Sequence, residues 1–259
     1  MQNKVLFLLW IGALLAGSGV APAETITLNP SADATLFEVN PGNSAGGAAF
    51  FNSGTTQNRM KNRALLQFDI ASMVPAGAHI TSVGLQLEVL RVPVDGFEIS
   101  FFGLHRMLRP WVEGTTFATT GMGSPAQPGD ATWNYASASG DSWSEPGGGI
   151  GVDFAAQQSS GVFIYGLGTY QFEGTADLAN EVQTWLDHPE SNFGWLLFCE
   201  TEELPFTARR FGSREDPQSA PVLTIEFVTV PEPGVMALGA VGLAILLGWR
   251  SIWRTRLVR

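Results

Sequence analysis

The feature that most constrains the fold of this chain is a two-residue alternation of apolar and polar side chains. In the run R-A-L-L-Q-F-D-I at 63–70, every even-numbered residue is apolar, whereas the odd-numbered positions include Gln67 and Asp69. A second stretch, 80–94, alternates in the same way. A period of two places alternate side chains on opposite faces of an extended strand. Both stretches are therefore predicted to be half-buried strands.

The rest of the central region repeats this pattern in shorter pieces. Further strands are predicted at 25–28, 98–108, 131–135, 162–172, 194–200, 206–212 and 221–228. The segments between them are mostly short and use many of the 30 Gly and 15 Pro residues of the 259-residue chain. Short turns of this composition favour antiparallel pairing over helical crossovers. We expect an all-β, antiparallel β-sandwich.

One segment has a helical period instead. Leu178, Val182, Trp185 and Leu186 are spaced at i, i+4, i+7 and i+8, and Pro189 follows. This spacing predicts a single amphipathic helix of about three turns. We expect it to cover one opening of the sandwich, with Trp185 as a core residue rather than a stacking platform for a ligand.

The first 23 residues have the layout of a secretory signal peptide. Lys4 precedes an apolar run at 5–16, and small residues end in Ala21-Pro22-Ala23. This order predicts export with cleavage before Glu24, and a retained membrane anchor is the alternative. No Cys stands at the cleavage point, so a lipoprotein is not indicated.

The last 29 residues, 231–259, combine a short motif, an apolar run and a basic tail. The motif is Pro231-Glu232-Pro233, and the uncharged run 235–249 is extended by Ile252 and Trp253 into an expected transmembrane helix at 235–253. The tail contains Arg250, Arg254, Arg256 and Arg259. Basic residues after an apolar segment stay in the cytoplasm, which would place the body of the protein outside the inner membrane.

This order resembles the PEP-CTERM sorting signal of bacterial envelope and matrix proteins. The resemblance implies an exosortase-type membrane protease as a partner, which would cut near the Pro-Glu-Pro motif. It also implies transient anchoring in the inner membrane, followed by residence in the cell envelope or extracellular matrix. A plain C-terminal anchor is the alternative.

Removal of both ends leaves one domain at 24–230, and an ordered series of motifs in it resembles the DNRLRE domain. The series is R-A-L-L-Q-F-D-I at 63–70, V-P-A-G-A-H-I-T-S-V-G-L-Q-L at 74–87, W-V-E-G-T at 111–115, D-A-T-W-N at 130–134, F-G-W-L-L-F at 193–198 and F-G-S-R-E-D-P-Q-S-A-P-V-L-T-I at 211–225. The resemblance implies a jelly-roll-like sandwich related to carbohydrate-binding modules. This chain differs by a long insertion between Glu113 and Asp130 and by having no attached catalytic domain.

The charge of the domain limits its partners. Residues 24–230 contain 23 Asp and Glu but nine Lys and Arg, a net charge of −14. Nucleic acid is therefore excluded as a partner, because its binding requires a basic surface. Cys199 is the only cysteine, so an internal disulfide cannot form, and its apolar neighbours indicate a buried thiol.

The sequence contains no pattern that specifies catalysis or a cofactor. The G-x-S-x-G match at 42–46 lacks the strand and helix that a nucleophile elbow needs, and the three histidines lack metal-ligand spacing. A structural calcium ion is compatible with the loop carboxylates, although no twelve-residue calcium loop is present. The carboxylates in question are Asp33, Glu38, Asp141 and Asp153. A lyase or hydrolase would use a pair drawn from Glu200, Glu202, Glu203, Glu215 and Asp216.

The few cations of the domain are the candidate ligand-binding residues. Six of the nine form two groups, Arg59, Lys61 and Arg63, and Arg209, Arg210 and Arg214. The first three share parity and would stand on one face if the strand began that early. Arginine can hold a uronate carboxylate or a sulfate through two parallel hydrogen bonds. The alternative is that these cations pair with the domain's own carboxylates, as Arg214 would with Glu215 or Asp216.

Trp143 is the aromatic residue predicted to be exposed and able to stack on a sugar, because it lies in a Gly- and Ser-rich stretch. Taken together, these patterns predict an exported, non-catalytic surface or matrix protein that binds an extracellular polysaccharide, with an acidic glycan suiting the cations. The alternatives are a purely structural matrix component and a polysaccharide lyase or hydrolase.

Overall fold

The computed structural model describes residues 22–138 and 140–229. The expected signal peptide, the Pro-Glu-Pro motif, the expected transmembrane helix and the arginine tail lie outside the described residues, except for the signal's last two residues, Pro22 and Ala23. Residues 23–228 form a compact unit that contains all the strands given below and their cores. In the described residues no helix is long and apolar enough to cross a membrane.

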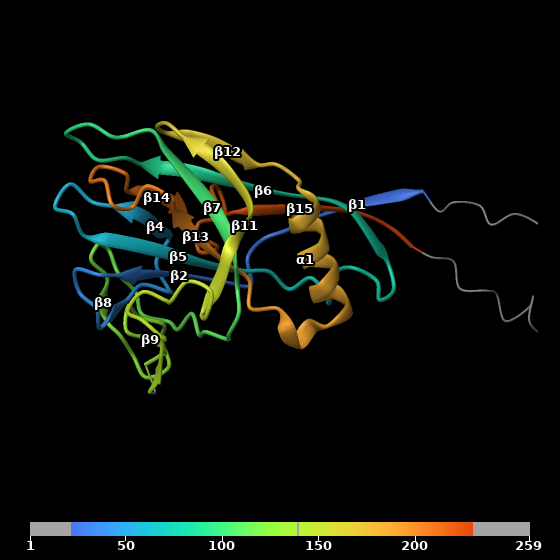
Figure 1. Cartoon of the computed structure of the whole chain (residues 1–259), viewed down its shortest axis with the longest axis horizontal. Coiled ribbons are helices and arrows are strands. Elements are labelled where there is room, and N and C mark those ends of the chain that lie inside the picture. Colours follow the sequence, from blue (N-terminus) through green and yellow to red (C-terminus); the bar gives the residue numbers. More distant parts are fainter. Residues whose placement is uncertain (1–21, 139, 230–259) are drawn as a thin grey trace, which may run out of the picture. The chain divides into compact units, whose positions relative to one another are not determined.

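The described unit is mostly β-structure, and every pair of named strands is antiparallel (Figure 1). The all-β, antiparallel prediction is confirmed. The strands are β1 (Ala23–Leu28), β2 (Ala32–Phe37), β3 (Asn43–Ser44), β4 (Phe50–Thr55), β5 (Lys61–Gln67), β6 (His79–Arg91), β7 (Ser100–Met107), β8 (Ser124–Pro125), β9 (Tyr135–Ser137), β10 (Asp141–Ser142), β11 (Phe154–Ile164), β12 (Gly168–Phe172), β13 (Trp195–Cys199), β14 (Arg209–Gly212) and β15 (Val222–Val228).

Eleven strands form one continuous sheet that curls into a sandwich-like arrangement. Its order is β1-β15-β6-β14-β4-β5-β13-β7-β11, with β12 on β6 and β2 on β5. Strand β4 joins the two layers, because its first four residues pair with β14 and its last two, Gly54 and Thr55, pair with β5. Gly54 has φ +94°, and a Cβ there would lie 2.6 Å from the Thr207 carbonyl oxygen. The bend between the layers therefore requires glycine.

The main core lies between the two layers. Alternating residues of β6 point into it, together with Leu66 of β5, Leu197 of β13 and Leu223 of β15. Burying such side chains contributes roughly 25 cal/mol per Å² of apolar surface. The alternation read from the sequence is thus what fixes the inner face of each layer.

The predicted helix is present as α1 (Ala176–Asp187), followed by the 3-10 turn η1 (Pro189–Ser191). The Thr175 hydroxyl accepts a hydrogen bond from the Leu178 main-chain N–H at 3.0 Å and caps the helix. The four apolar residues of the helix are all buried in the main core: Leu178, Val182, Trp185 and Leu186. The centres of the Trp185 and Trp195 rings are 4.5 Å apart. The prediction that Trp185 is a core residue is confirmed.

A second core lies on the outer face of the layer that contains β5 and β13. Leu65 and Leu196 point outward from these strands, and residues of the long 109–153 segment cover them. Trp143 belongs to this cover: it is 5% exposed, and its indole N–H donates to the Thr132 carbonyl at 2.9 Å. The prediction that Trp143 is exposed is wrong, because the apolar outer face needs an aromatic cover.

Candidate anion-binding pocket

Three of the predicted ligand-binding cations are paired with the domain's own carboxylates. The Arg63 guanidinium donates to both carboxylate oxygens of Glu202, at 3.1 and 2.8 Å, and to the main-chain carbonyls of Gly147 and Gly148. The Lys61 ammonium donates to Glu203 at 2.6 Å. These contacts, on the partly buried side chains of β5, match the alternative in which the cations are structural.

Arg214 is paired in the same way. Its guanidinium donates to Glu113 at 2.7 Å and lies 3.0 Å from a Glu215 oxygen, and its main-chain N–H donates to Asp33. Asp33, Glu113 and Glu215 form the one group of described residues whose ligand atoms lie close enough to hold a metal ion. Burial raises the pKa of both Asp33 and Glu113. Arg214 contacts all three carboxylates and already supplies the positive charge that a metal ion would bring to this group.

The other carboxylates considered for calcium do not join this group. Asp141 and Asp153 both contact the Arg109 guanidinium, and Glu38 accepts a hydrogen bond from the Lys61 main-chain N–H. These contacts place the carboxylates on protein donors, and we assign no calcium ligands among them.

Arg209 is a structural residue. It is 1% exposed, and its guanidinium donates to six main-chain carbonyls at 2.6–3.4 Å. The carbonyls come from the β6–β7 connection, from the end of β11 and the residue after it, and from the β13–β14 connection. They belong to Glu98, Ile164, Tyr165, Phe206, Thr207 and Ala208. Burial lowers the pKa of Arg209.

Arg59 is exposed, but it does not share the face of Lys61 and Arg63. Strand β5 begins at Lys61, and Arg59 lies in the preceding turn with φ +61°. The expectation of a three-cation row on one strand face is therefore wrong. The turn twists Arg59 out of the strand's two-residue period.

Arg210 differs from the ion-paired cations described above and has a second arginine beside it. In the register of β14 with β6, Arg210 lies opposite Arg91. Neither residue has a carboxylate partner among the described residues. Burial, and secondarily the charge of Arg91, lowers the pKa of Arg210. The domain has a net charge of −14, so two neighbouring arginines whose charge no described carboxylate neutralises are unusual in it.

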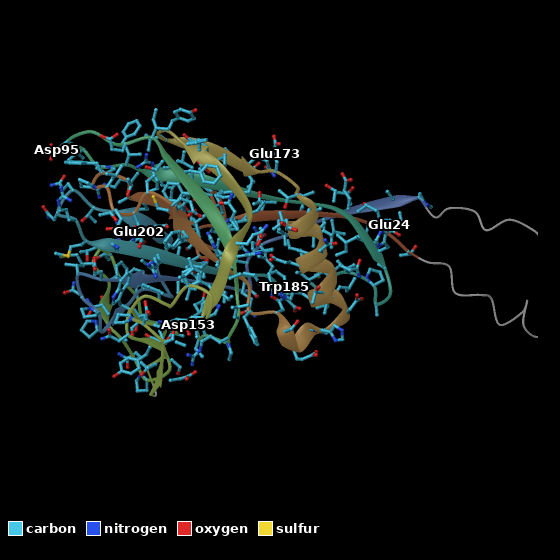
Figure 2. The ribbon with its side chains drawn as sticks, viewed as in Figure 1. Glu24, Asp95, Asp153, Glu173, Trp185 and Glu202 are labelled. Atoms are coloured by element: carbon cyan, nitrogen blue, oxygen red, sulfur yellow. The ribbon has the colours of Figure 1, made fainter. Side chains whose placement is uncertain are left out.

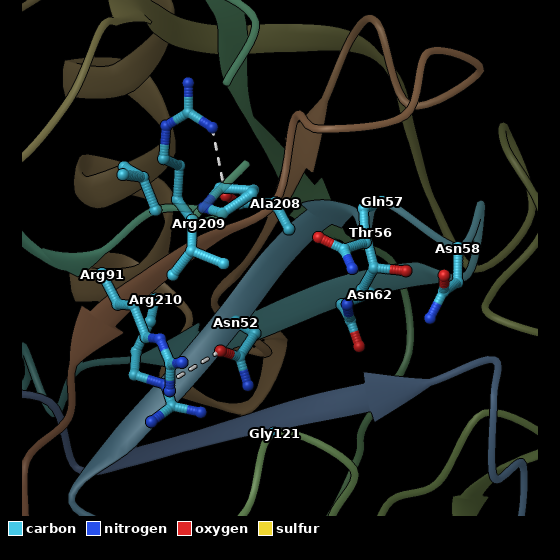
Figure 3. A pocket seen from close by; sticks show the side chains of 13 residues that line it. Asn52, Thr56, Gln57, Asn58, Asn62, Arg91, Gly121, Ala208, Arg209 and Arg210 are labelled. Carbon is cyan, nitrogen blue, oxygen red and sulfur yellow. Dashed lines mark hydrogen bonds between the residues drawn. The ribbon is translucent and has the colours of Figure 1, made fainter. Parts of the chain in front are cut away.

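These two arginines line a pocket of about 370 Å³ at the junction of β4, β6 and β14 (Figure 3). The Arg210 guanidinium carbon lies 3.6 Å from the centre of the Phe50 ring, and its Nε donates to the Asn52 side-chain oxygen at 3.4 Å. The Asn52 amide nitrogen is buried and has no acceptor among the described residues. A buried donor without a partner is costly, so this nitrogen is available to a ligand.

The remaining lining adds donors and no carboxylate. Gln57 and Asn58 from the β4–β5 turn contribute amides that have no partner in the described part of the chain, and 92–94 contribute an apolar rim. Among the residues that the structure describes, the lining includes no Asp, Glu, His, Cys or Tyr. Its chemistry is that of an anion receptor: guanidinium groups and amides that donate hydrogen bonds to a carboxylate, sulfate or phosphate.

Sequence reasoning included Arg210 but missed Arg91, Asn52 and the two turn amides. The alternation of β6 gave no signal for Arg91, because it places this residue on the same face as the buried Val89. The register shift between β6 and β14 instead sets Arg91 opposite Arg210. The contact between Arg91 and Arg210 depends on the pairing of β6 with β14, whose sequences are more than a hundred residues apart.

The pocket lies near one end of the described unit. Asp95, in the β6–β7 connection whose first residues line the pocket, and Glu24, in β1, are at opposite ends of this unit (Figure 2). Ala23 pairs with Val228, so both ends of the unit's chain leave from the end remote from Asp95. No protein-family model matches the chain, and no curated protein is significantly similar to it.

Proposed function

We propose that this protein is an exported, non-catalytic module that binds acidic polysaccharide through the Arg91/Arg210 pocket. The observation that carries the proposal is a pair of adjacent arginines, next to the amide nitrogen of Asn52, none of which has a carboxylate or other acceptor for its free donors within residues 22–138 and 140–229. A uronate carboxylate or a sulfate ester would neutralise the arginines and satisfy that nitrogen. The jelly-roll-like form of the sandwich and its likeness to DNRLRE domains belong to the same proposal.

The proposal includes the sorting of the protein at the cell envelope. The signal peptide directs export, the C-terminal helix holds the protein in the inner membrane, and an exosortase-type protease recognises the Pro-Glu-Pro motif. The pocket then opens at the end of the domain away from the point where the chain continues toward the anchor.

The binding experiment uses residues 22–229, a variant of the pocket and a control variant outside it. Affinity electrophoresis and calorimetry with alginate, polygalacturonate and chondroitin sulfate measure the affinity, with dextran as the neutral control. We expect salt-sensitive binding to at least one acidic polymer. Arg91→Gln with Arg210→Gln should weaken it at least about tenfold, because a hydrogen bond to a charged group contributes about 1.5–3 kcal/mol.

The control removes the charge of a cation that is already paired with a carboxylate, and it is compared with Arg210→Gln alone, which also removes one charge. Lys61→Gln should leave the affinity within about twofold, because the Lys61 ammonium already donates to Glu203. Equal losses in the control and in the pocket variants would contradict the assignment of the site. Steady release of unsaturated or reducing ends from any of these polymers would replace the proposal with that of a lyase or hydrolase.

The sorting experiment changes Pro231, Glu232 and Pro233 to alanine in the full chain. We expect the uncut protein to accumulate in the inner membrane, which immunoblotting of cell fractions measures. A protein of unchanged size in an unchanged fraction would show that the motif is not a sorting signal.

A further inference from the structure

A second pocket, of about 350 Å³, lies between α1 and the strands β7 and β11. It shares no residue with the Arg91/Arg210 pocket and is lined chiefly by polar side chains. These are Arg106, Gln157, Gln158, Asp177, Asn180 and Glu181. A volume of this size is at the lower end of the range for small-molecule sites. The pocket would hold one sugar ring or a disaccharide.

Arg106 and Glu181 are neighbours in the lining and form an ion pair without a hydrogen bond. The Arg106 Nε atom is buried and has no hydrogen-bond partner in the described part of the chain. The nearest Glu181 oxygen, Oε1, is 3.9 Å from it, beyond hydrogen-bond distance. The other oxygen, Oε2, accepts from the Ser159 hydroxyl at 2.6 Å and from the Trp195 indole N–H at 2.9 Å. The carboxylate is thus held in place by the protein while Oε1 stays available.

Two further side chains in the lining are free to hydrogen-bond to a ligand. The amides of Gln158 and Asn180 have no partner among the residues that the structure describes, and both residues are exposed. Gln157 is already paired with Asp177 at 3.2 Å. The pocket therefore presents a guanidinium donor, a carboxylate acceptor and two amides that can do either.

This set of groups selects a neutral ligand rich in hydroxyls. Glu181 and Asp177 together outweigh the single charge of Arg106, so an acidic sugar is repelled here, in contrast to the first pocket. Each hydroxyl both donates and accepts, so neighbouring hydroxyls on one ring can satisfy a donor and an acceptor that are too far apart to meet directly. Leaving a buried donor unpaired is costly, and such a ligand removes that cost.

We propose that this pocket binds one neutral hexopyranose unit, with one hydroxyl accepting from Arg106 and its neighbour donating to Oε1 of Glu181. Gln158 and Asn180 bind the flanking hydroxyls. The module then has two sites of different chemistry, one for an acidic and one for a neutral sugar, and can bridge two chains or grip a mixed polysaccharide. This inference goes beyond the proposed function and does not depend on it.

The Trp195 indole N–H is a built-in reporter of the site, because it donates to the same carboxylate. In ¹⁵N-labelled residues 22–229, the indole signal and the side-chain amide signals of Gln158 and Asn180 are followed by NMR. The probes are the methyl pyranosides of glucose, galactose and mannose, each titrated to high millimolar concentration, with glycine as a zwitterionic comparison. We expect a saturable shift of all three signals with at least one hexoside and none with glycine.

Variants connect the shifts to the pocket. Gln158→Ala and Asn180→Ala remove exposed side chains and should keep the fold while weakening hexoside binding about three- to tenfold. Gln86→Ala, an exposed residue of β6 outside both pockets, is the matched control and should have no effect. The proposal is overturned if no hexoside moves the signals, if glycine moves them equally, or if the control weakens binding as much.

The two proposals fail separately. The double variant of Arg91 and Arg210 should keep the hexoside shifts in full, since no lining residue is shared. Loss of acidic polysaccharide binding with intact hexoside shifts removes only the function proposed for the first pocket. The reverse result removes only the second site.

Discussion

At the scale of single residues, adjacent arginines on β14 have opposite roles. Both residues line the anion-binding pocket, but the buried Arg209 guanidinium donates to six main-chain carbonyls, whereas that of Arg210 donates to the Asn52 side chain. Arg209→Met would leave those buried carbonyls without donors, so we expect a loss of about 3 kcal/mol or more in the free energy of unfolding. Arg210→Met should cost less than about 1 kcal/mol. Urea denaturation of both variants measures the difference, and equal costs would contradict the structural role of Arg209.

Parity predicts that Arg209 and Arg210 face opposite ways, but not which of them is buried. The sequence groups both with Arg214 as ligand-binding candidates. The carbonyls that hold Arg209 come from segments centred near residues 98, 165 and 207, and only the folded chain brings these together. A buried arginine whose two terminal nitrogens donate to main-chain carbonyls leaves no charge pattern in the sequence.

At the scale of elements, the helix shows how well periodicity predicts local structure. The four apolar positions, with Pro189 beyond the last turn, were sufficient to predict α1, and Thr175 supplies its N-terminal cap. Thr175→Ala should lower the free energy of unfolding by about 1 kcal/mol, and Thr175→Ser should restore most of it. Thermal denaturation of the pair checks this. A Ser variant as unstable as the Ala variant would show that the methyl group, not the hydroxyl, stabilises this end of the helix.

Elements that depend on irregular pairing were harder to predict. Ile80 and Val83 of β6 are both buried although their parities differ, because a register shift against β15 leaves Thr81 with no residue opposite it in the strand pairing. The 109–153 segment, which contains the long insertion between Glu113 and Asp130, packs as a cover over β5 and β13. The available signal was Leu65 and Leu196, apolar residues at positions that parity places on the outer face.

At the scale of the whole molecule, the acidic composition affects how stability depends on pH. Burial raises the pKa of Asp33, Glu113 and Glu181 in the folded state. A carboxyl group with a raised folded pKa favours folding while it is protonated, below its unfolded pKa near 4. That contribution is lost as the pH rises through the folded value. These groups therefore make the protein less stable at neutral pH than in mild acid, against the usual trend for carboxylates that form ion pairs.

Asp33→Asn tests this directly, because an amide oxygen can still accept from the Arg214 main-chain N–H but carries no charge. We expect the melting temperature of the variant, relative to the wild type, to be higher at pH 7 than at pH 4.

Asp153 is expected to show the opposite dependence of stability on pH. Although burial opposes its charge, hydrogen bonds from Gly149 and Ser144 lower its pKa, so its contribution is present at neutral pH and lost as the pH falls. Asp153→Asn should therefore destabilise the protein more at pH 7 than at pH 4. Calorimetric melting of the two variants across this range distinguishes them, and the same sign in both would contradict the assignment of burial as the cause at Asp33.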